Sequence, residues 1–482
     1  MRLAALLALC MGALCYAEDA RTGPGEVEFK QGLELLRNKK YSEARQHFQR
    51  ATQMNPRFSQ AFFYLGMSAL HDGDRRSAEV ALRSALKLEP RAVNALYNLG
   101  VLLLDDKKPA EAAKYFERAR QSGPLSPELA INLIRAQLEA GQTDKAVTLA
   151  EVAGPQFGNS VEFDLIVGKL FLAHGVAGPA CSALQTAERL QPQQMDIALP
   201  MAAACLENKD VASARAALES IREKAHDSPQ YHAMAAKVHL AAGEKDASIE
   251  EMNAAVRLAP RDPVLLLTLA RVYQKYGEQQ KAIAVLETAA ALDPRTPEIP
   301  YSLAVSFITA DDEPTAMKFL ARALQLDPEF ARGLFMLGSI HLAFDRLDEA
   351  EKPLVKALQL QPRNPFYRCF LGMLRAAQSR PEDAQKEFEQ AIAISPSYAL
   401  GHFHLGRLLQ QQGKYAEAQA ELERSIALRP DLAEAFYQLG LLLRKRGEVE
   451  KSEQALARFK AIRDAEYSER AVILKELQDT LQ

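Results

Sequence analysis

The chain has 482 residues, with 59 lysines and arginines against 62 aspartates and glutamates, a formal net charge of −3. This balance argues against a dedicated nucleic-acid-binding protein, because such proteins rely on an excess of basic groups to neutralise phosphates. Hydrophobic residues make up 48% and charged residues 25%, which excludes a disordered chain and an integral membrane protein. The five cysteines are too few for a disulfide-based scaffold.

The N-terminal residues have the pattern of a cleaved export signal. Arg2 precedes an uninterrupted apolar run over residues 3–15, and Cys15 and Ala17 supply the small residues that a signal peptidase reads. The run is too short to span a bilayer as a helix. We therefore expect residues 1–17 to be a signal peptide and the mature protein to be periplasmic, with secretion as the alternative.

Two other interpretations of this segment are weaker. A lipid anchor needs a small residue before the modified cysteine, but Leu9 precedes Cys10 and Leu14 precedes Cys15. A buried N-terminal helix is the other alternative. Residues 18–25 are mostly polar and end in Gly-Pro-Gly, which is typical of a mature start and of a linker at residues 18–24.

A repeat with a period of 34 residues follows the linker. Steps of 34 from Gly32 to Gly440 meet glycine or alanine at twelve of thirteen positions. The series that begins at Ala44 is alanine or serine throughout, and the series that begins at Pro56 is proline at ten of thirteen positions. No insertion interrupts this register, so one structural unit is repeated along the chain.

Each repeat has the pattern of a helix pair. Apolar residues follow helical spacing in two stretches, as in residues 62–70 and 78–86, with a turn at residues 71–74 between them. We expect small residues such as Gly66 and Ala78 to face each other and let the two helices approach. The recurrent proline ends the second helix, and stacking of the pairs creates a continuous core.

These three series resemble the motif of the tetratricopeptide repeat family over residues 25–466, as thirteen repeats. Pentatricopeptide repeats have a similar period but lack the proline series. The resemblance implies an all-α fold, a right-handed α-solenoid of antiparallel helix pairs. Repeats 4–7, about residues 127–260, match poorly, since Ile134 replaces the small residue and Pro200 falls inside a first helix. We expect irregular geometry and the weakest protection around residues 125–235.

Residues 467–482 are predicted to form a C-terminal capping helix. Residues 461–482 contain no proline or glycine, and their apolar side chains recur every three or four positions with charged ones elsewhere. A helix with one polar face can cover the last apolar surface of an open stack. A seam for a homodimer is the alternative interpretation of the same helix.

No pattern of catalytic residues is present. The chain lacks the glycine-rich phosphate-binding, nucleophile-elbow, HExxH and CxxC motifs. His402 and His404 are two residues apart and diverge on a helix, while His232 and His239 share a face without a third ligand. We therefore expect no enzyme activity, no metal and no cofactor.

Three cysteines lie beyond the signal peptide: Cys181, Cys205 and Cys369. The family resemblance places Cys181 early in the second helix of repeat 5 and Cys205 late in the first helix of repeat 6. These helices are expected to be antiparallel neighbours. A disulfide between the two cysteines can form in an oxidising compartment. The alternative is two separate buried thiols that act as small apolar groups.

The resemblance also implies a ligand groove lined by the first helices, at the second, fifth, sixth, ninth and thirteenth positions of each repeat. Aromatic residues recur at the fifth position in repeats 1–3 and 9–13, and they can either contact a ligand or only pack on neighbouring repeats. The candidate groove residues are Phe29, Phe63, Tyr97, Asn98, Asn132, Tyr301, Arg332, Phe335, Phe366, Phe403, Arg407 and Tyr437. The C-terminal aromatic stripe is expected to hold an extended peptide or an amphipathic helix, oriented by Arg332 and Arg407.

Two binding modes of the family are disfavoured by position. No repeat has the lysine at the fifth position that holds a C-terminal carboxylate, and only Asn98 and Asn132 provide the sixth-position asparagine that grips a peptide backbone. Acidic second positions and basic ninth positions should largely neutralise each other. We expect a non-enzymatic, exported scaffold that binds protein or peptide partners, without nucleic acid and without a membrane span. The alternative is an accessory subunit of an envelope machine for secretion, polysaccharide export or outer-membrane assembly.

Overall fold

The computed structural model describes residues 23–158 and 160–463. The expected signal peptide, most of the expected linker and the expected C-terminal helix with its dimer seam lie outside these residues. All regular secondary structure in the described residues is α-helical. No described helix is both long enough and apolar enough to cross a membrane.

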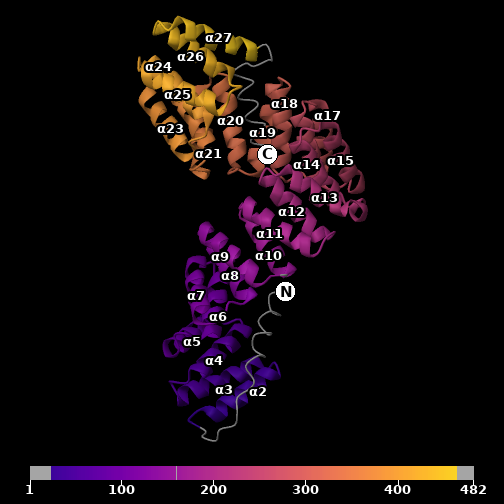
Figure 1. Ribbon diagram of the computed structural model, residues 1–482, viewed down its shortest axis with the longest axis vertical. Coiled ribbons are helices and arrows are strands. Elements are labelled where there is room, and N and C mark those ends of the chain that lie inside the picture. Colours follow the sequence, from indigo (N-terminus) through magenta and orange to yellow (C-terminus); the bar gives the residue numbers. More distant parts are fainter. Residues whose placement is uncertain (1–22, 159, 464–482) are drawn as a thin grey trace. The chain divides into compact units, whose positions relative to one another are not determined.

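The chain forms two compact units, Met1–Glu223 and Lys224–Gln482 (Figure 1). The helices of the N-terminal unit are α2 (Glu26–Arg37), α3 (Tyr41–Met54), α4 (Ser59–His71), α5 (Arg75–Leu88), α6 (Val93–Asp105), α7 (Pro109–Ser122), α8 (Pro127–Glu139), α9 (Thr143–Gln156), α10 (Val161–Ala173), α11 (Ala177–Leu190), α12 (Met195–Glu207) and α13 (Val211–Ala225), whose last two residues belong to the next unit.

The C-terminal unit continues with the same kind of element. Its helices are α14 (Pro229–Ala241), α15 (Lys245–Leu258), α16 (Pro263–Lys275), α17 (Gln279–Leu292), α18 (Glu298–Thr309), α19 (Glu313–Leu326), α20 (Ala331–Ala343), α21 (Leu347–Leu360), α22 (Pro365–Ala377), α23 (Pro381–Ile394), α24 (Ala399–Gln411), α25 (Tyr415–Leu428), α26 (Ala433–Lys445) and α27 (Val449–Arg463).

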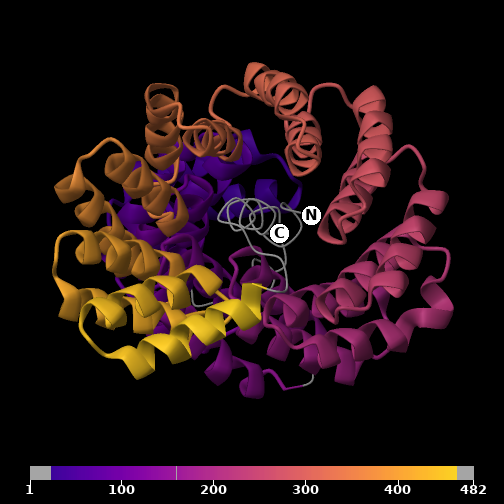
Figure 2. The same ribbon diagram turned by 90° about the horizontal axis from the view of Figure 1, so that it is seen from above.

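Within each unit, consecutive helices form pairs joined by tight turns, so the two helices of a pair run antiparallel. In the C-terminal unit the pairs follow one another along a curved row (Figure 2). Neighbouring first helices pack on each other there, α20 on α22 and α22 on α24. The first helices therefore lie on the inner side of this curve.

The turn inside every pair contains one residue in the left-handed backbone region. Seven of these residues are glycine, such as Gly73 with φ 78°, and six are not, such as Asp345 with φ 55°. The thirteen residues are Lys39, Gly73, Lys107, Gly141, Gly175, Lys209, Gly243, Gly277, Asp311, Asp345, Ser379, Gly413 and Gly447. They are spaced 34 residues apart, so the backbone follows the same period as the sequence.

The recurrent glycine of the first helix lies opposite a large side chain of the second helix. A Cβ atom added to Gly66 would lie 2.9 Å from Leu82 Cγ, and one added to Gly372 would lie 2.6 Å from Phe388 Cε1. The sequence led us to expect small residues on both helices at this contact. The structure confirms this at Gly66, where the Ala78 carbonyl oxygen lies 3.2 Å from the added Cβ position, and it also places a leucine or phenylalanine at the contact, which fills the interior while the backbones stay close.

The poorly matching repeats still form helix pairs, and the packing is looser around α9. Helix α9 buries only Ala146 and Ala153, and a cavity of about 610 Å³ lies between α9, α10 and α11. Pro200 does not end α12, because it lies in the second turn and removes a single backbone donor. Weak protection of residues 125–235 stays a prediction, and the cavity gives it a physical basis.

Candidate ligand site on the first helices

Most of the predicted aromatic groove residues in the C-terminal unit are buried. Phe335 is 1% exposed, because the rings of Phe366, Tyr367 and Phe370 surround it at centroid distances of 4.6–4.9 Å. Tyr301, Phe366 and Phe403 are buried as well. The structure therefore favours the packing interpretation of these rings, and direct ligand contact by them stays an untested prediction.

Tyr437 differs from the other fifth-position aromatics. Its side chain is 40% exposed, and its ring lies 5.0 Å from the ring of Phe459 on α27. It is available to a ligand without any rearrangement. It lies on α26, beside the last described helix of the chain.

The N-terminal aromatic candidates also pack on neighbouring aromatic rings. Phe29 is buried against the rings of Phe48, Phe58 and Tyr64, at centroid distances of 4.7–5.7 Å. Phe63 is half-buried and packs edge-on against Tyr64. These contacts hold the first two helix pairs together.

The two sixth-position asparagines use their amide nitrogens within the protein. Asn98 Nδ2 donates to the Asn94 carbonyl, and Asn132 Nδ2 donates to the Tyr97 hydroxyl at 2.9 Å and to the Glu128 carbonyl. Burial raises the pKa of Tyr97, with Glu128 adding to the effect and the Asn132 hydrogen bond opposing it. A ligand backbone would have to replace an existing bond of the Asn132 amide nitrogen, whereas the Asn98 nitrogen makes one such bond and has a second N–H.

Arg332 lies in a compensated cluster. Its guanidinium is 3.6 Å from the Glu298 carboxylate and rests over the rings of Phe330 and Tyr301. Arg271 from α16 adds a second cation, whose pKa is lowered by burial and then by Arg332. The pKa of nearby Tyr367 is raised to about 12, chiefly by burial.

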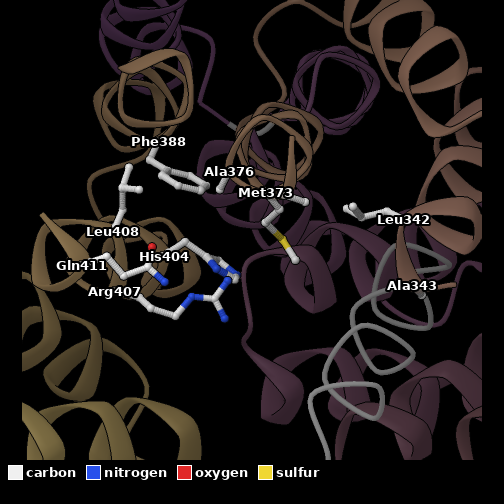
Figure 3. A pocket seen from close by; sticks show the side chains of 10 residues that line it. Leu342, Ala343, Met373, Ala376, Phe388, His404, Arg407, Leu408 and Gln411 are labelled. Atoms are coloured by element: carbon white, nitrogen blue, oxygen red, sulfur yellow. The ribbon is translucent and has the colours of Figure 1, made fainter. Parts of the chain in front are cut away.

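Arg407 lies at the edge of a cavity of about 450 Å³ on the inner side of the C-terminal unit (Figure 3). Three first helices, α20, α22 and α24, provide most of the wall, and α23 adds Phe388. The lining residues are Leu342, Ala343, Met373, Ala376, Ala377, Phe388, His404, Arg407, Leu408 and Gln411. The volume is within the range of ligand pockets in proteins.

His404 is the least expected part of this wall. It is 5% exposed, its ring stacks on Phe388 at 5.6 Å, and its Nδ1 atom has no hydrogen-bond partner. Burial, and then the charge of Arg407, holds the pKa of His404 well below its usual range, so the ring is neutral near pH 7. A buried polar atom without a partner costs about 1–3 kcal/mol, which a ligand can offset.

The sequence indicated only part of this site. The sequence predicts Arg407 as a groove residue and argues against His404 as a metal ligand, but it assigns no role to Met373 or Gln411. His404, Arg407 and Gln411 occupy the sixth, ninth and thirteenth positions of one repeat, and this spacing was the available signal. His402 points elsewhere, with Nδ1 2.6 Å from Glu421 and Nε2 3.1 Å from the Pro396 carbonyl.

Cys181 and Cys205 form a disulfide in the structure, with 4.8 Å between their Cα atoms. The bond connects α11 with α12, the second helix of one pair with the first helix of the next. Cys369 is a buried thiol on α22. Among the described residues, no group of three histidine, cysteine, aspartate or glutamate side chains is placed to hold a metal ion.

The chain matches sequence profiles of the tetratricopeptide repeat family along most of its length. One profile, described as "Tetratricopeptide repeat", matches residues 29–75, 68–127, 267–329, 320–365 and 371–418. A second with the same description matches residues 103–170 and 174–238, and a "TPR repeat" profile matches residues 406–447. The chain belongs to the tetratricopeptide repeat family, as predicted, and is an all-α repeat scaffold of the kind that mediates protein–protein interactions.

The similarity to an individual curated protein covers less of the chain than the family profiles do. A stretch of 100 residues is 35% identical to the "Probable biofilm formation methyltransferase WspC" of Pseudomonas putida. This stretch is 20% of the chain and 24% of that protein, so the chain spans about a quarter of the relative's length.

Solved structures of similar fold include the following two. The crystal structure of the APC/C hetero-tetramer Cut9-Hcn1 has a TM-score of 0.45 and 13% identity, over 88% of this chain and 97% of that chain. The structure of yeast Tom70 has a TM-score of 0.44 and 16% identity, over 95% of each chain.

Proposed function

We propose that this protein is an exported scaffold that binds partner proteins through the inner side of its C-terminal unit. The observation that carries the proposal is the cavity between α20, α22 and α24. It combines an apolar wall with the Arg407 guanidinium and with a buried His404 nitrogen that has no hydrogen-bond partner. Family membership supports a partner that is a protein.

The disulfide supports the exported location. Cys181 and Cys205 lie at bonding distance in the interior, and such a bond persists in oxidising compartments but is rare in the cytosol. The apolar run at residues 3–15 has the pattern of an export signal, which this location requires. N-terminal sequencing of the native protein should find a start near Glu18, and an intact Met1 would contradict export.

Affinity capture tests the binding function. The mature chain, immobilised, should retain a specific set of proteins from the exported fraction, and the Arg407→Gln variant should retain less of them. Arg271→Gln is the matched control, because Arg271 holds the same position four repeats earlier and does not line the cavity. Failure of the wild-type chain to retain any protein specifically would contradict the scaffold function.

The same experiment addresses the narrower alternative. A subunit of an envelope machine should recover one stoichiometric complex, whereas a general adaptor should recover several partners in unequal amounts. Mass spectrometry of the retained proteins distinguishes the two outcomes.

A further inference from the structure

We infer that the cavity between α9, α10 and α11 binds a small molecule that carries a cationic amine on an apolar body. The cavity lies in the N-terminal unit (Figure 1), whereas the surface proposed above for partner proteins lies in the C-terminal unit. Helices α9 and α11 are the second helices of their pairs, and α10 is the one first helix that lines the cavity. The site is therefore not part of a face formed by neighbouring first helices.

The cavity exists because α9 lacks the large side chain that fills the interior of the other helix pairs. The position that holds Leu82 and Phe388 in their pairs is leucine, phenylalanine or methionine in every repeat except this one, where it is Ala150. One helical turn later, Gly154 takes a position that is leucine, isoleucine or valine in six other repeats. A Cβ atom added to Gly154 would meet only Asp164 Oδ1, at 4.0 Å. The missing side chains leave a space of about 610 Å³.

Most of the cavity wall is apolar. Phe163 and Phe171 from α10 contribute to it, together with Val147 from α9 and Pro179 from α11. The volume is within the range of pockets that hold small molecules. Such a wall matches a ligand body made of one or two rings or of a short alkyl chain.

Asp164 is a charged side chain whose usual counterpart is missing. It holds the fourth position of its repeat, and the twenty-third position of the same repeat is the uncharged Ala183. In each of the four other repeats with an ionisable fourth position, the twenty-third position carries a side chain of opposite type, and the two lie at bonding distance. These pairs are His47–Glu28 at 2.7 Å, His232–Glu251 at 2.6 Å, Arg368–Glu387 at 2.8 Å and His402–Glu421 at 2.6 Å.

The amine of a ligand would take the place of the missing cation. Both Asp164 and Ala183 line the cavity, and the Asp164 carboxylate accepts no hydrogen bond from the described residues. Burial raises the pKa of Asp164, and the charge of Arg189 opposes this effect. An ammonium group that donates to the carboxylate would offset the cost of its burial through a charge-assisted hydrogen bond.

The other charges of the cavity also favour a cation. Arg189 lines the cavity but forms no ion pair with Asp164, and Glu151 adds a second carboxylate. The described lining residues therefore carry two carboxylates and one guanidinium. A cavity with this excess of negative charge attracts a cationic ligand and repels an anionic one.

Three small molecules with the same ring system test the inference on the full mature chain: naphthylmethylamine, naphthylmethanol and naphthoate. A blocked peptide, acetyl-Ser-Leu-Lys-Leu-Ser-amide, tests whether the lysine side chain of a protein is preferred to a free amine. Binding is followed by the NMR signals of the Val147 and Val167 methyl groups in protein labelled with 13C-valine. The signals are assigned with Val147→Ile and Val167→Ile.

The amine should shift both valine signals at millimolar concentration and bind about ten-fold more tightly than the alcohol, while naphthoate should bind more weakly still. In Asp164→Asn, the preference for the amine over the alcohol should fall below about two-fold. Glu162→Gln is the matched control, because it removes a carboxylate from the same helix at a residue that does not line the cavity. It should leave the preference unchanged.

A second variant restores the internal pair. Ala183→Arg places a cation opposite Asp164, as in the Arg368–Glu387 pair, and should weaken amine binding at least about ten-fold while the chain stays folded by circular dichroism. Ala183→Met is its control, because it adds a side chain of similar length without the charge. It should weaken the amine and the alcohol alike and keep the preference between them.

Four outcomes would overturn the inference: equal binding of the amine and the alcohol, unshifted valine signals, an unchanged preference in Asp164→Asn, or tighter binding of the lysine peptide. None of them affects the capture of partner proteins proposed for the C-terminal unit. Conversely, a failure of that capture leaves amine binding to the N-terminal unit intact, so the two proposals are tested separately.

Discussion

The ring of Phe388 stacks on the imidazole of His404, with 5.6 Å between the ring centroids and 17° between the ring planes. Phe388 belongs to α23 and also fills the space opposite Gly372 of α22. One side chain therefore links the interior of one helix pair to the cavity wall provided by the next. A substitution that moves the Phe388 ring inside the α22/α23 pair should therefore also move the His404 side chain in the cavity wall.

The first prediction uses that connection. Gly372→Ala would place a Cβ atom 2.6 Å from Phe388 Cε1, so the ring must shift, at a cost of about 1–3 kcal/mol in unfolding free energy. The ring-current-shifted NMR signals of His404 should move. Gly440→Ala, which meets Leu456 in another pair, is the control: it should lose stability but leave the His404 signals in place. Unmoved His404 signals in Gly372→Ala would contradict the connection.

The second prediction concerns pH. Because burial holds the folded-state pKa of His404 well below its unfolded value of about 6.5, the folded state resists protonation of this ring. The resulting stability is present above about pH 6.5 and is lost as the pH falls toward the folded pKa. The free energy of unfolding of the C-terminal unit should therefore decrease between pH 7 and pH 5.

Variants identify the group responsible for this dependence. His404→Gln should flatten the pH dependence, while His341→Gln should remove only the smaller part due to His341, whose pKa is also lowered by burial. Denaturant unfolding at several pH values measures both. An unchanged slope in His404→Gln would contradict the prediction.

The fold could be predicted from the sequence because the small residues in the helices and the prolines between the helix pairs recur with the same period. Glycine, alanine and proline recur at 34 residues, and each of these residue types acts through a local backbone or packing effect. The left-handed turn residue is harder to predict from the sequence, because lysine, glutamine, aspartate or serine replaces glycine in several of the turns. At these turns the surrounding helix pair determines the backbone conformation, and the residue type does not indicate it.

The third prediction follows from those turns. Lys209 has φ 62° and Gly175 has φ 70°, both in exposed turns of the N-terminal unit. Lys209→Gly should stabilise the unit by about 0.5–1 kcal/mol by removing the Cβ clash, and Gly175→Ala should destabilise it by about 1 kcal/mol. Lys209→Ala should change little, because it keeps the Cβ atom. Urea unfolding monitored by circular dichroism measures all three, and a loss of stability in Lys209→Gly would contradict the argument.

The fourth prediction separates two residues at the same position of their repeats. Phe335 is 1% exposed and Tyr437 is 40% exposed. Phe335→Ala should lower the unfolding free energy of the C-terminal unit by about 3–5 kcal/mol, whereas Tyr437→Ala should lower it by less than about 1 kcal/mol. Equal stability of the two variants in denaturant titrations would contradict the burial of Phe335.

The candidate site was harder to predict than the fold. Position in the repeat tells which side chains face the inner side of the curve, but not whether neighbouring repeats cover them. Phe335 is covered because α22 presents three aromatic rings to it. The cavity at His404 exists because α20 and α22 present only small or flexible side chains, such as Ala343 and Met373, at the corresponding place. Both outcomes depend on combinations of residues from several repeats.

The last prediction concerns the disulfide between α11 and α12. A bond that closes a loop with a sequence separation of 24 restricts the unfolded chain and should contribute about 3–4 kcal/mol to the stability of the N-terminal unit. In a chain that starts at Glu18, alkylation of the denatured, unreduced protein should modify Cys369 alone, and alkylation after reduction should modify all three cysteines.

The Cys181→Ala, Cys205→Ala double variant should unfold at lower urea concentration than the oxidised wild type and match the reduced one. Cys369→Ala is the control: its disulfide is intact, so its urea midpoint should respond to reductant as the wild type does. If three cysteines react without reduction, Cys181 and Cys205 are separate thiols. They then no longer support the proposal that the protein is exported to an oxidising compartment.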